Sequence, residues 1–132
     1  VVPEGAWAVL DIRFWKGQDR ERIMRTVREM KPSLRGAHLK FSVESLTPPM
    51  EKTKASSRLF ERAQEIAASI GQTLKGGKTG GGSDASLAAN MGIPTLDGLG
   101  PDGDGIHADH EHIVLPSLVE RTALLTKLLT EL

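Results

Sequence analysis

A glycine-rich run near the carboxyl end carries the residues best suited to chemistry. It covers residues 98–112, and glycine lets a short loop bring several side chains towards one point. Imidazole and carboxylate groups are ligands for divalent metals. The run therefore predicts a metal site. Its candidate donors fall within six consecutive positions, as His107, Asp109, His110, Glu111 and His112.

The composition limits how such a metal could be held and what else could bind. The chain has 132 residues and no cysteine, so any metal must be bound by imidazole and carboxylate. Seventeen Lys and Arg residues balance seventeen Asp and Glu residues, which gives no charge-based reason for nucleic acid or an anionic membrane as partner. No apolar run approaches the roughly 20 residues that span a bilayer. A small or neutral partner is expected.

Two alternating apolar segments predict strands in the amino-terminal part. From Ala6 to Phe14 the even positions are apolar, and alternation returns over residues 37–43. Between them, apolar residues at helical spacing from Ile23 to Met30 predict a helix that Pro32 ends. The unit is β-α-β, half of what a closed two-layer sandwich contains.

A linker over residues 47–54, with two prolines and several charges, divides the chain. We therefore predict two units, residues 1–48 and 49–132, of mixed α/β class. The second unit contains a helical apolar stripe from Leu59 to Ile70, a short helix from Ser83 or Asp84 to Met91, a buried strand at 93–96, and a final helix that opens at Pro116. The apolar residues expected to face a core from that final helix are Leu118, Val119, Leu125, Leu128, Leu129 and Leu132.

The glycine-rich loop at residues 76–84 invites comparison with a phosphate-binding loop. The Walker pattern requires glycine where this chain has Gln72, so the spacing argues against a nucleotide site. The backbone amides of Gly81, Gly82 and Ser83 favour binding of a carboxylate beside a helix amino end. A flexible loop with an ordinary N-cap is the alternative.

The other candidate residues also have simpler explanations. Taken singly, His107, His110 and His112 are each expected to be surface or hydrogen-bonded loop residues, and His38 is expected to be exposed. Arg13 is by default a charge on a strand surface. A fixed guanidinium beside a site is, however, the usual clamp for a substrate carboxylate.

The order of these segments resembles the carboxyl-terminal part of the dinuclear zinc exopeptidase and aminoacylase family, which includes glutamate carboxypeptidases and succinyl-diaminopimelate desuccinylases. The resemblance covers almost the whole chain, and the last of its motifs is the most specific. It is carried by Val1-Val2-Pro3 with Leu10-Asp11-Ile12-Arg13-Phe14, by Gly80-Gly81-Gly82-Ser83-Asp84-Ala85, by Gly92-Ile93-Pro94-Thr95, and by the segment from Gly103 to Glu111.

The resemblance implies a fold and a set of roles. Residues 1–48 would be the second half of a lid or dimerisation domain, and residues 49–132 the carboxyl-terminal part of a catalytic domain. His107 would be a zinc ligand, although Ala108 replaces the serine common at the next position. Glu111 would be a second-shell or structural residue. The residues implied to hold the carboxylate of a substrate are Arg13, Gly81, Gly82 and Ser83.

The upstream segments that complete the site in this family have no counterpart here. Family members place there a His-x-Asp pair, a bridging Asp, and a Glu-Glu pair whose first Glu is the general base. A single retained histidine cannot hold two zinc ions.

We therefore expect a carboxyl-terminal fragment of a hydrolase that releases an amino acid, such as glutamate, from a peptide or N-acyl substrate. The fragment alone should be inactive, bind zinc weakly, and self-associate through its lid strands into a homo-oligomer. A non-catalytic dimerisation or interaction module is the alternative.

Overall fold

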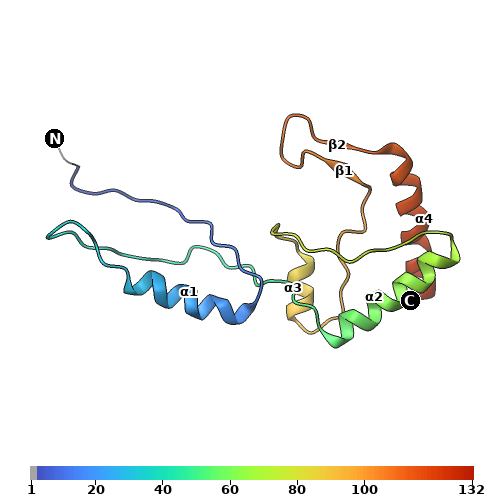
Figure 1. Ribbon diagram of the computed structural model, residues 1–132, viewed down its shortest axis with the longest axis horizontal. Helices are drawn as coiled ribbons and strands as arrows, with labels where there is room; N and C mark the ends of the chain where they lie inside the picture. The colour runs from blue at the N-terminus through green and yellow to red at the C-terminus, as the bar shows by residue number, and fades with distance from the viewer. Residues whose placement is uncertain (1–2) are drawn as a thin grey trace.

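The computed structural model describes residues 3–132; Val1 and Val2, which open the first of the resembling segments, lie outside the described residues. Figure 1 shows an amino-terminal part around one helix, joined to a second part that contains the other regular elements. In chain order these elements are α1 (Gly17–Glu29), α2 (Lys54–Ser69), α3 (Ala85–Asn90), β1 (Gly103–Asp104), β2 (His112–Ile113) and α4 (Leu115–Glu131).

Helix α2 has strong local signals at both ends. Thr53 and Ser56 form a capping box, in which the Thr53 hydroxyl accepts from the Ser56 amide at 3.0 Å and the Ser56 hydroxyl accepts from the Thr53 amide at 2.9 Å. Gly71 follows the helix with φ +75°, a left-handed conformation that glycine adopts without steric cost. The predicted stop at Gly71 is confirmed, while the helix begins five residues before the predicted stripe.

The core lies between α2 and α4, which pack side by side (Figure 1). It consists of six buried apolar residues, with Phe60, Ile70, Leu96 and Leu99 packed around them. The buried set is Ala63, Ile66, Ala67, Leu74, Leu124 and Leu128. Burial of this apolar surface, from residues far apart in the sequence, is what stabilises the carboxyl-terminal part.

Helix α4 agrees with the prediction in extent but not in its buried face. Pro116 stands in its first turn, as predicted. Of the six residues expected to face a core, Leu128 is buried and the others are exposed, with Val119 at 72% and Leu129 at 79%. Leu124, which was not predicted, is fully buried. The helix is apolar around much of its circumference, so periodicity alone selected the wrong stripe.

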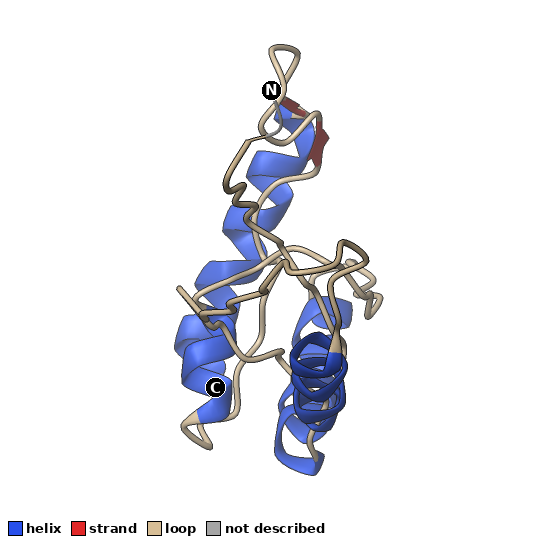
Figure 2. Ribbon diagram, turned by 90° about the vertical axis from the view of Figure 1, so that its left-hand side faces the viewer, coloured by secondary structure: helices blue, strands red, loops and turns tan. Residues whose placement is uncertain are grey.

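Neither predicted strand in the amino-terminal part forms a hydrogen-bonded strand. Residues 6–14 and 37–43 are irregular, and the single sheet in the described chain is the pair β1–β2, as Figure 2 also shows. Alternation specifies which face of a strand is apolar, but a strand also needs backbone partners, and half a sandwich does not supply them. Apolar side chains of both segments stay exposed, among them Trp7 at 88% and Val43 at 53%.

The remaining predicted elements are mixed in outcome. The helix between the two alternating segments forms as α1, and its residues Ile23 and Val27 are half-buried. The short helix forms as α3, and Gly92 follows it with φ +85°. Residues 93–96 are not a strand, although Leu96 packs against the core. The result is a mixed structure of helices with a small two-stranded sheet, compatible with part of an α/β domain.

The linker contacts both parts of the chain. The Glu51 carboxylate accepts a hydrogen bond from the Gly17 amide at 2.9 Å, at the start of α1. The Asn90 side chain, at the end of α3, donates to the Pro49 carbonyl at 2.9 Å. These two bonds fix the linker at both sides and thereby bring the amino-terminal part next to α3. None of the described helices is long and apolar enough to cross a bilayer.

Candidate functional site

The hairpin formed by β1 and β2 is built around two glycines that cannot be replaced without movement. The strands are antiparallel, with Gly103 opposite Ile113. A Cβ atom on Gly103 would collide with the His112 carbonyl oxygen. Gly105 has φ +73°, and a Cβ atom there would lie 2.7 Å from a ring carbon of His110. The glycine spacing in this run therefore has a steric cause.

His107 lies in the loop of this hairpin, where the sequence predicts a metal ligand. It is exposed and has φ +67°, the one positive φ among the described non-glycine residues. The left-handed conformation is unfavourable for a residue with a Cβ atom. Two backbone bonds hold the loop, from the Ala108 amide to the Gly105 carbonyl at 2.8 Å and from the Glu111 amide to the Ala108 carbonyl at 3.0 Å. An ordered but strained loop of this kind is characteristic of functional positions.

The other donors of the run do not gather around His107. The His112 ring nitrogen Nδ1 lies 2.9 Å from the His110 carbonyl oxygen, and the Glu111 side chain is exposed. No group of three or more His, Asp or Glu residues within residues 3–132 is placed to hold a metal. The imidazole of His107 fits zinc chemically as one ligand, and a full centre needs ligands from outside this set.

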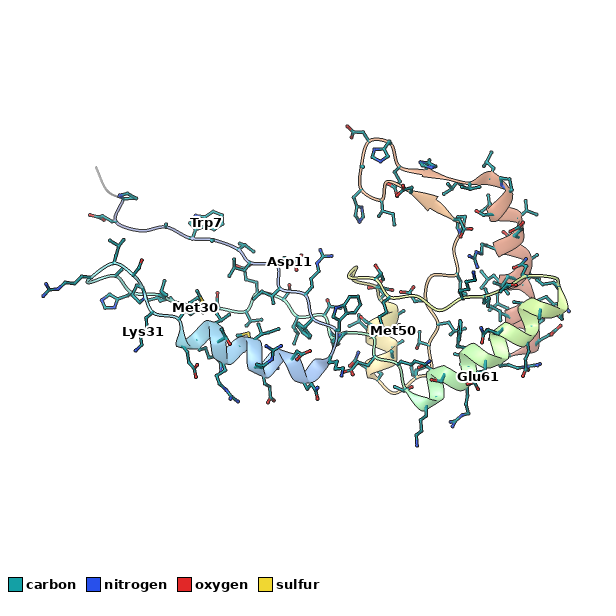
Figure 3. The ribbon with its side chains drawn as sticks, viewed as in Figure 1. Trp7, Asp11, Met30, Lys31, Met50 and Glu61 are labelled. Carbon is teal, nitrogen blue, oxygen red and sulfur yellow. The ribbon has the colours of Figure 1, made fainter. Side chains whose placement is uncertain are left out.

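Arg13 is brought to the glycine-rich loop from 67 residues away. Its Nη1 donates to the Gly80 carbonyl at 2.9 Å. Its Nε and Nη2 donate to one carboxylate oxygen of Asp11, at 3.0 and 2.8 Å. Figure 3 labels Asp11, which lies towards the end of the amino-terminal part that adjoins α3.

The arginine is charged in any case, and the nearby aspartate acts in the same direction. The hydrogen bond from Arg13 to Asp11, together with the negative charge of that carboxylate, raises the pKa of the Arg13 guanidinium above its ordinary value. The side chain is exposed, at 64%, so it is accessible to a ligand. Three of its N–H groups are engaged, which leaves further donors of the planar fork for a carboxylate.

The glycine-rich loop offers fewer backbone donors than the sequence predicts. The Gly81 amide donates to the Thr79 hydroxyl at 3.2 Å, so it is already engaged. The Ser83 hydroxyl accepts from the Ala85 amide at 3.1 Å, at the start of α3. For the amides of Gly82 and Ser83 the described part of the chain provides no hydrogen-bond acceptor. Those two amides are the donors that remain for a ligand.

The structure thus brings together the residues predicted to bind the substrate carboxylate, but not the predicted metal ligand. Arg13 and the loop that contains Gly81, Gly82 and Ser83 meet directly, whereas His107 and Glu111 belong to a separate hairpin. Sequence reasoning missed the role of Asp11 in holding Arg13. The signal was present in the chain, because residues two apart in an extended segment lie on the same face.

Comparison with known proteins defines the class to which this fold and site belong. The chain belongs to the peptidase family M20/M25/M40, whose profile matches residues 3–131. The match covers both the segment with Arg13 and the hairpin with His107, so the predicted family is confirmed.

Two curated relatives are similar to this chain. One is carboxypeptidase G2 of Pseudomonas sp. (strain RS-16), 28% identical over 136 residues that include 100% of this chain and 33% of that protein. The other is the uncharacterized protein YqjE of Bacillus subtilis (strain 168), 29% identical over 96 residues, which are 73% of this chain and 25% of that protein. The chain therefore spans a third or less of the length of these relatives. No solved structure matches it significantly.

Proposed function

We propose that this chain is the carboxyl-terminal part of a metal-dependent hydrolase that releases an amino acid with a free carboxylate from a peptide or N-acyl substrate. Membership of a peptidase family and similarity to a carboxypeptidase support the hydrolytic activity. Residues 1–48 would form half of a lid or dimerisation domain, and residues 49–132 part of the catalytic domain.

The contact between Arg13 and Gly80 is the observation that carries the carboxylate specificity. In this proposal Arg13 binds the substrate carboxylate with its remaining N–H groups, and the amides of Gly82 and Ser83 complete the pocket. Asp11 holds the guanidinium in place through two hydrogen bonds. Such a site recognises the free α-carboxylate that every released amino acid carries, and release of glutamate is a proposal that follows from the family resemblance alone.

His107 contributes one ligand to a zinc centre in this proposal, and residues beyond this chain supply the others. A bound zinc ion provides Lewis acidity towards the scissile carbonyl and activates water for hydrolysis. The chain's own task is to present the His107 imidazole from a hairpin of fixed shape. Glu111, which lies four residues further along the same loop, would support it.

Hydrolysis assays on the full-length protein test this proposal. We expect it to cleave N-acylated amino acids, to lose activity on treatment with a chelator, and to regain it with Zn²⁺. His107→Ala should abolish the zinc-restored activity, while the matched change His38→Ala, at an exposed histidine in the amino-terminal unit, should leave it intact. A zinc-loaded protein that hydrolyses none of these substrates would refute the assignment.

The exposed apolar side chains of the amino-terminal part favour a second role, self-association. Val9 is 66% exposed and Phe41 is 43% exposed, and neither segment has a strand partner among residues 3–132. Unpaired extended segments readily pair with those of another copy. In this proposal two chains pair through these segments, as a homo-oligomer. The role does not depend on catalysis, so it also serves a non-catalytic module.

Sedimentation velocity distinguishes this surface from the other apolar surfaces of the chain. The double variant Val9→Lys with Phe41→Lys should shift the protein to monomer. The control Val119→Lys, at an apolar position on α4 that is 72% exposed, should leave the oligomer unchanged. A wild-type monomer at high concentration would rule out the oligomer.

A further inference from the structure

The hairpin that carries His107 is too small to hold its own position. Strands β1 and β2 have two residues each, and an isolated two-stranded hairpin is marginally stable in water. The loop residues are exposed except for the half-buried Gly105, and the four strand residues are exposed as well. Something at the base of the hairpin must therefore determine the direction in which the His107 imidazole is presented.

A buried serine joins both arms of that base to α4. Asp102 precedes β1 and Val114 follows β2, and the Val114 amide donates to the Asp102 carbonyl at 2.7 Å. Ser117, only 5% exposed, stands in the first turn of α4. Its hydroxyl accepts from the Asp102 amide at 2.8 Å and donates to the Val114 carbonyl at 2.6 Å. One hydroxyl thus bridges the two arms.

An arginine one turn further along α4 forms an ion pair with the side chain of the same aspartate. Arg121 donates through Nη2 to the Asp102 carboxylate at 3.0 Å. The arginine side chain is 27% exposed, the most sheltered arginine among the ion pairs of the described chain. Residues four apart on a helix share a face, so Ser117 and Arg121 hold Asp102 from one surface of α4. The pair is a single charge-assisted contact, and it adds to the Ser117 hydrogen bonds that hold the same residue.

We propose that Ser117 and Arg121 are positioning residues, which fix the hairpin through Asp102 and so set where His107 meets the metal. The inference rests on the proposed function, in which His107 is a zinc ligand. Neither residue touches the metal in this scheme. Their effect passes through Asp102 and the backbone of β1, so it is smaller than that of a group bonded directly to the ligand.

The test is the Zn²⁺ affinity of the full-length protein, measured by competition with a chromophoric chelator, with the unfolding midpoint measured in parallel. Arg121→Ala should weaken zinc binding by about 2- to 5-fold, the range expected for loss of a partly exposed ion pair. Arg121→Lys should recover part of that loss, because the lysine ammonium keeps a positive charge facing the Asp102 carboxylate. The control Arg62→Ala, which breaks an exposed pair with Glu65 on α2, should leave zinc affinity unchanged.

A double-mutant cycle separates positioning from general destabilisation. If Arg121 acts through Asp102, the variant with both Asp102→Asn and Arg121→Ala should bind zinc about as weakly as the Arg121→Ala variant alone. Additive losses, or a zinc affinity of Arg121→Ala equal to that of Arg62→Ala, would overturn the inference. A loss of zinc affinity that only follows a fall in the unfolding midpoint would overturn it as well.

The same experiment separates this inference from the proposed function. If His107→Ala weakens zinc binding and Arg121→Ala does not, the positioning role is wrong while the ligand assignment stands. If His107→Ala leaves zinc binding unchanged, both are wrong.

Discussion

Arg13 and Gly80 lie 67 residues apart in the sequence and are joined by a hydrogen bond of 2.9 Å from the guanidinium to the carbonyl oxygen. The bond connects the amino-terminal part of the chain to the glycine-rich loop before α3. The linker makes this approach possible, because Glu51 contacts the start of α1 and Pro49 accepts from Asn90. The residues proposed to bind the carboxylate lie where these parts meet.

The core between α2 and α4 should be the main source of stability in the carboxyl-terminal part. Leu124→Ala removes a fully buried side chain and should lower the free energy of unfolding by about 2 to 5 kcal/mol. The control Leu129→Ala, at a position 79% exposed on the same helix, should change it by less than about 0.5 kcal/mol. Chemical denaturation followed by circular dichroism measures both. Equal losses would mean that α4 packs through a different face.

The hairpin should depend on glycine at position 105. Gly105→Ala places a Cβ atom 2.7 Å from the His110 ring and forces alanine into φ +73°, which costs about 1 to 2 kcal/mol for the conformation alone. Gly100→Ala is the matched control, since a Cβ atom there meets nothing within 4 Å. Amide hydrogen exchange of the hairpin should accelerate in the first variant only. Unchanged exchange would show that the left-handed turn is not needed.

The left-handed backbone conformation of His107 should lower the stability of the protein, whereas its imidazole should bind zinc. His107→Gly relieves the positive φ, so it should be more stable than His107→Ala by about 1 kcal/mol. Both variants remove the imidazole, and both should lose zinc affinity to the same extent. Thermal unfolding and zinc titration of the two proteins check these outcomes. Equal stabilities would argue against strain at this position.

The sequence predicted local features well where local chemistry decides them. The glycine stop of α2, Pro116 in α4 and Gly92 after α3 are short-range signals, and the helices that they delimit are present. The capping box at Thr53 and Ser56 is a signal of the same kind, but it was missed, and the start of α2 was placed five residues too late. The two alternating segments failed as strands because pairing depends on partners elsewhere, which alternation does not encode. The core face of α4 failed for a related reason, since Leu124 is selected by packing against α2.

The site could be predicted only in part. The segments around Arg13 and Gly81 were expected to share one site, and they meet in space, although the role of Arg13 in binding substrate remains a prediction. The engagement of the Gly81 amide by Thr79 depends on loop geometry that residue types do not specify. Of the clustered donors between His107 and His112, only His107 was expected to bind zinc, and that assignment stays a prediction. Within residues 3–132, no group of three or more His, Asp or Glu side chains is placed to hold a metal.

The most direct test of the central claim is the specificity constant of the full-length protein for an N-acyl amino acid and for the same compound with its carboxylate blocked as a carboxamide. Arg13→Ala should lower kcat/KM for the acid roughly 10- to 100-fold, the equivalent of about 1.5 to 3 kcal/mol for a hydrogen bond to a charged group, and leave the carboxamide almost unaffected. Arg22→Ala, which breaks an exposed pair with Asp19 on α1, should change neither value. If Arg13→Ala lowers kcat/KM equally for both compounds, or for neither, Arg13 does not bind the carboxylate and the account is contradicted.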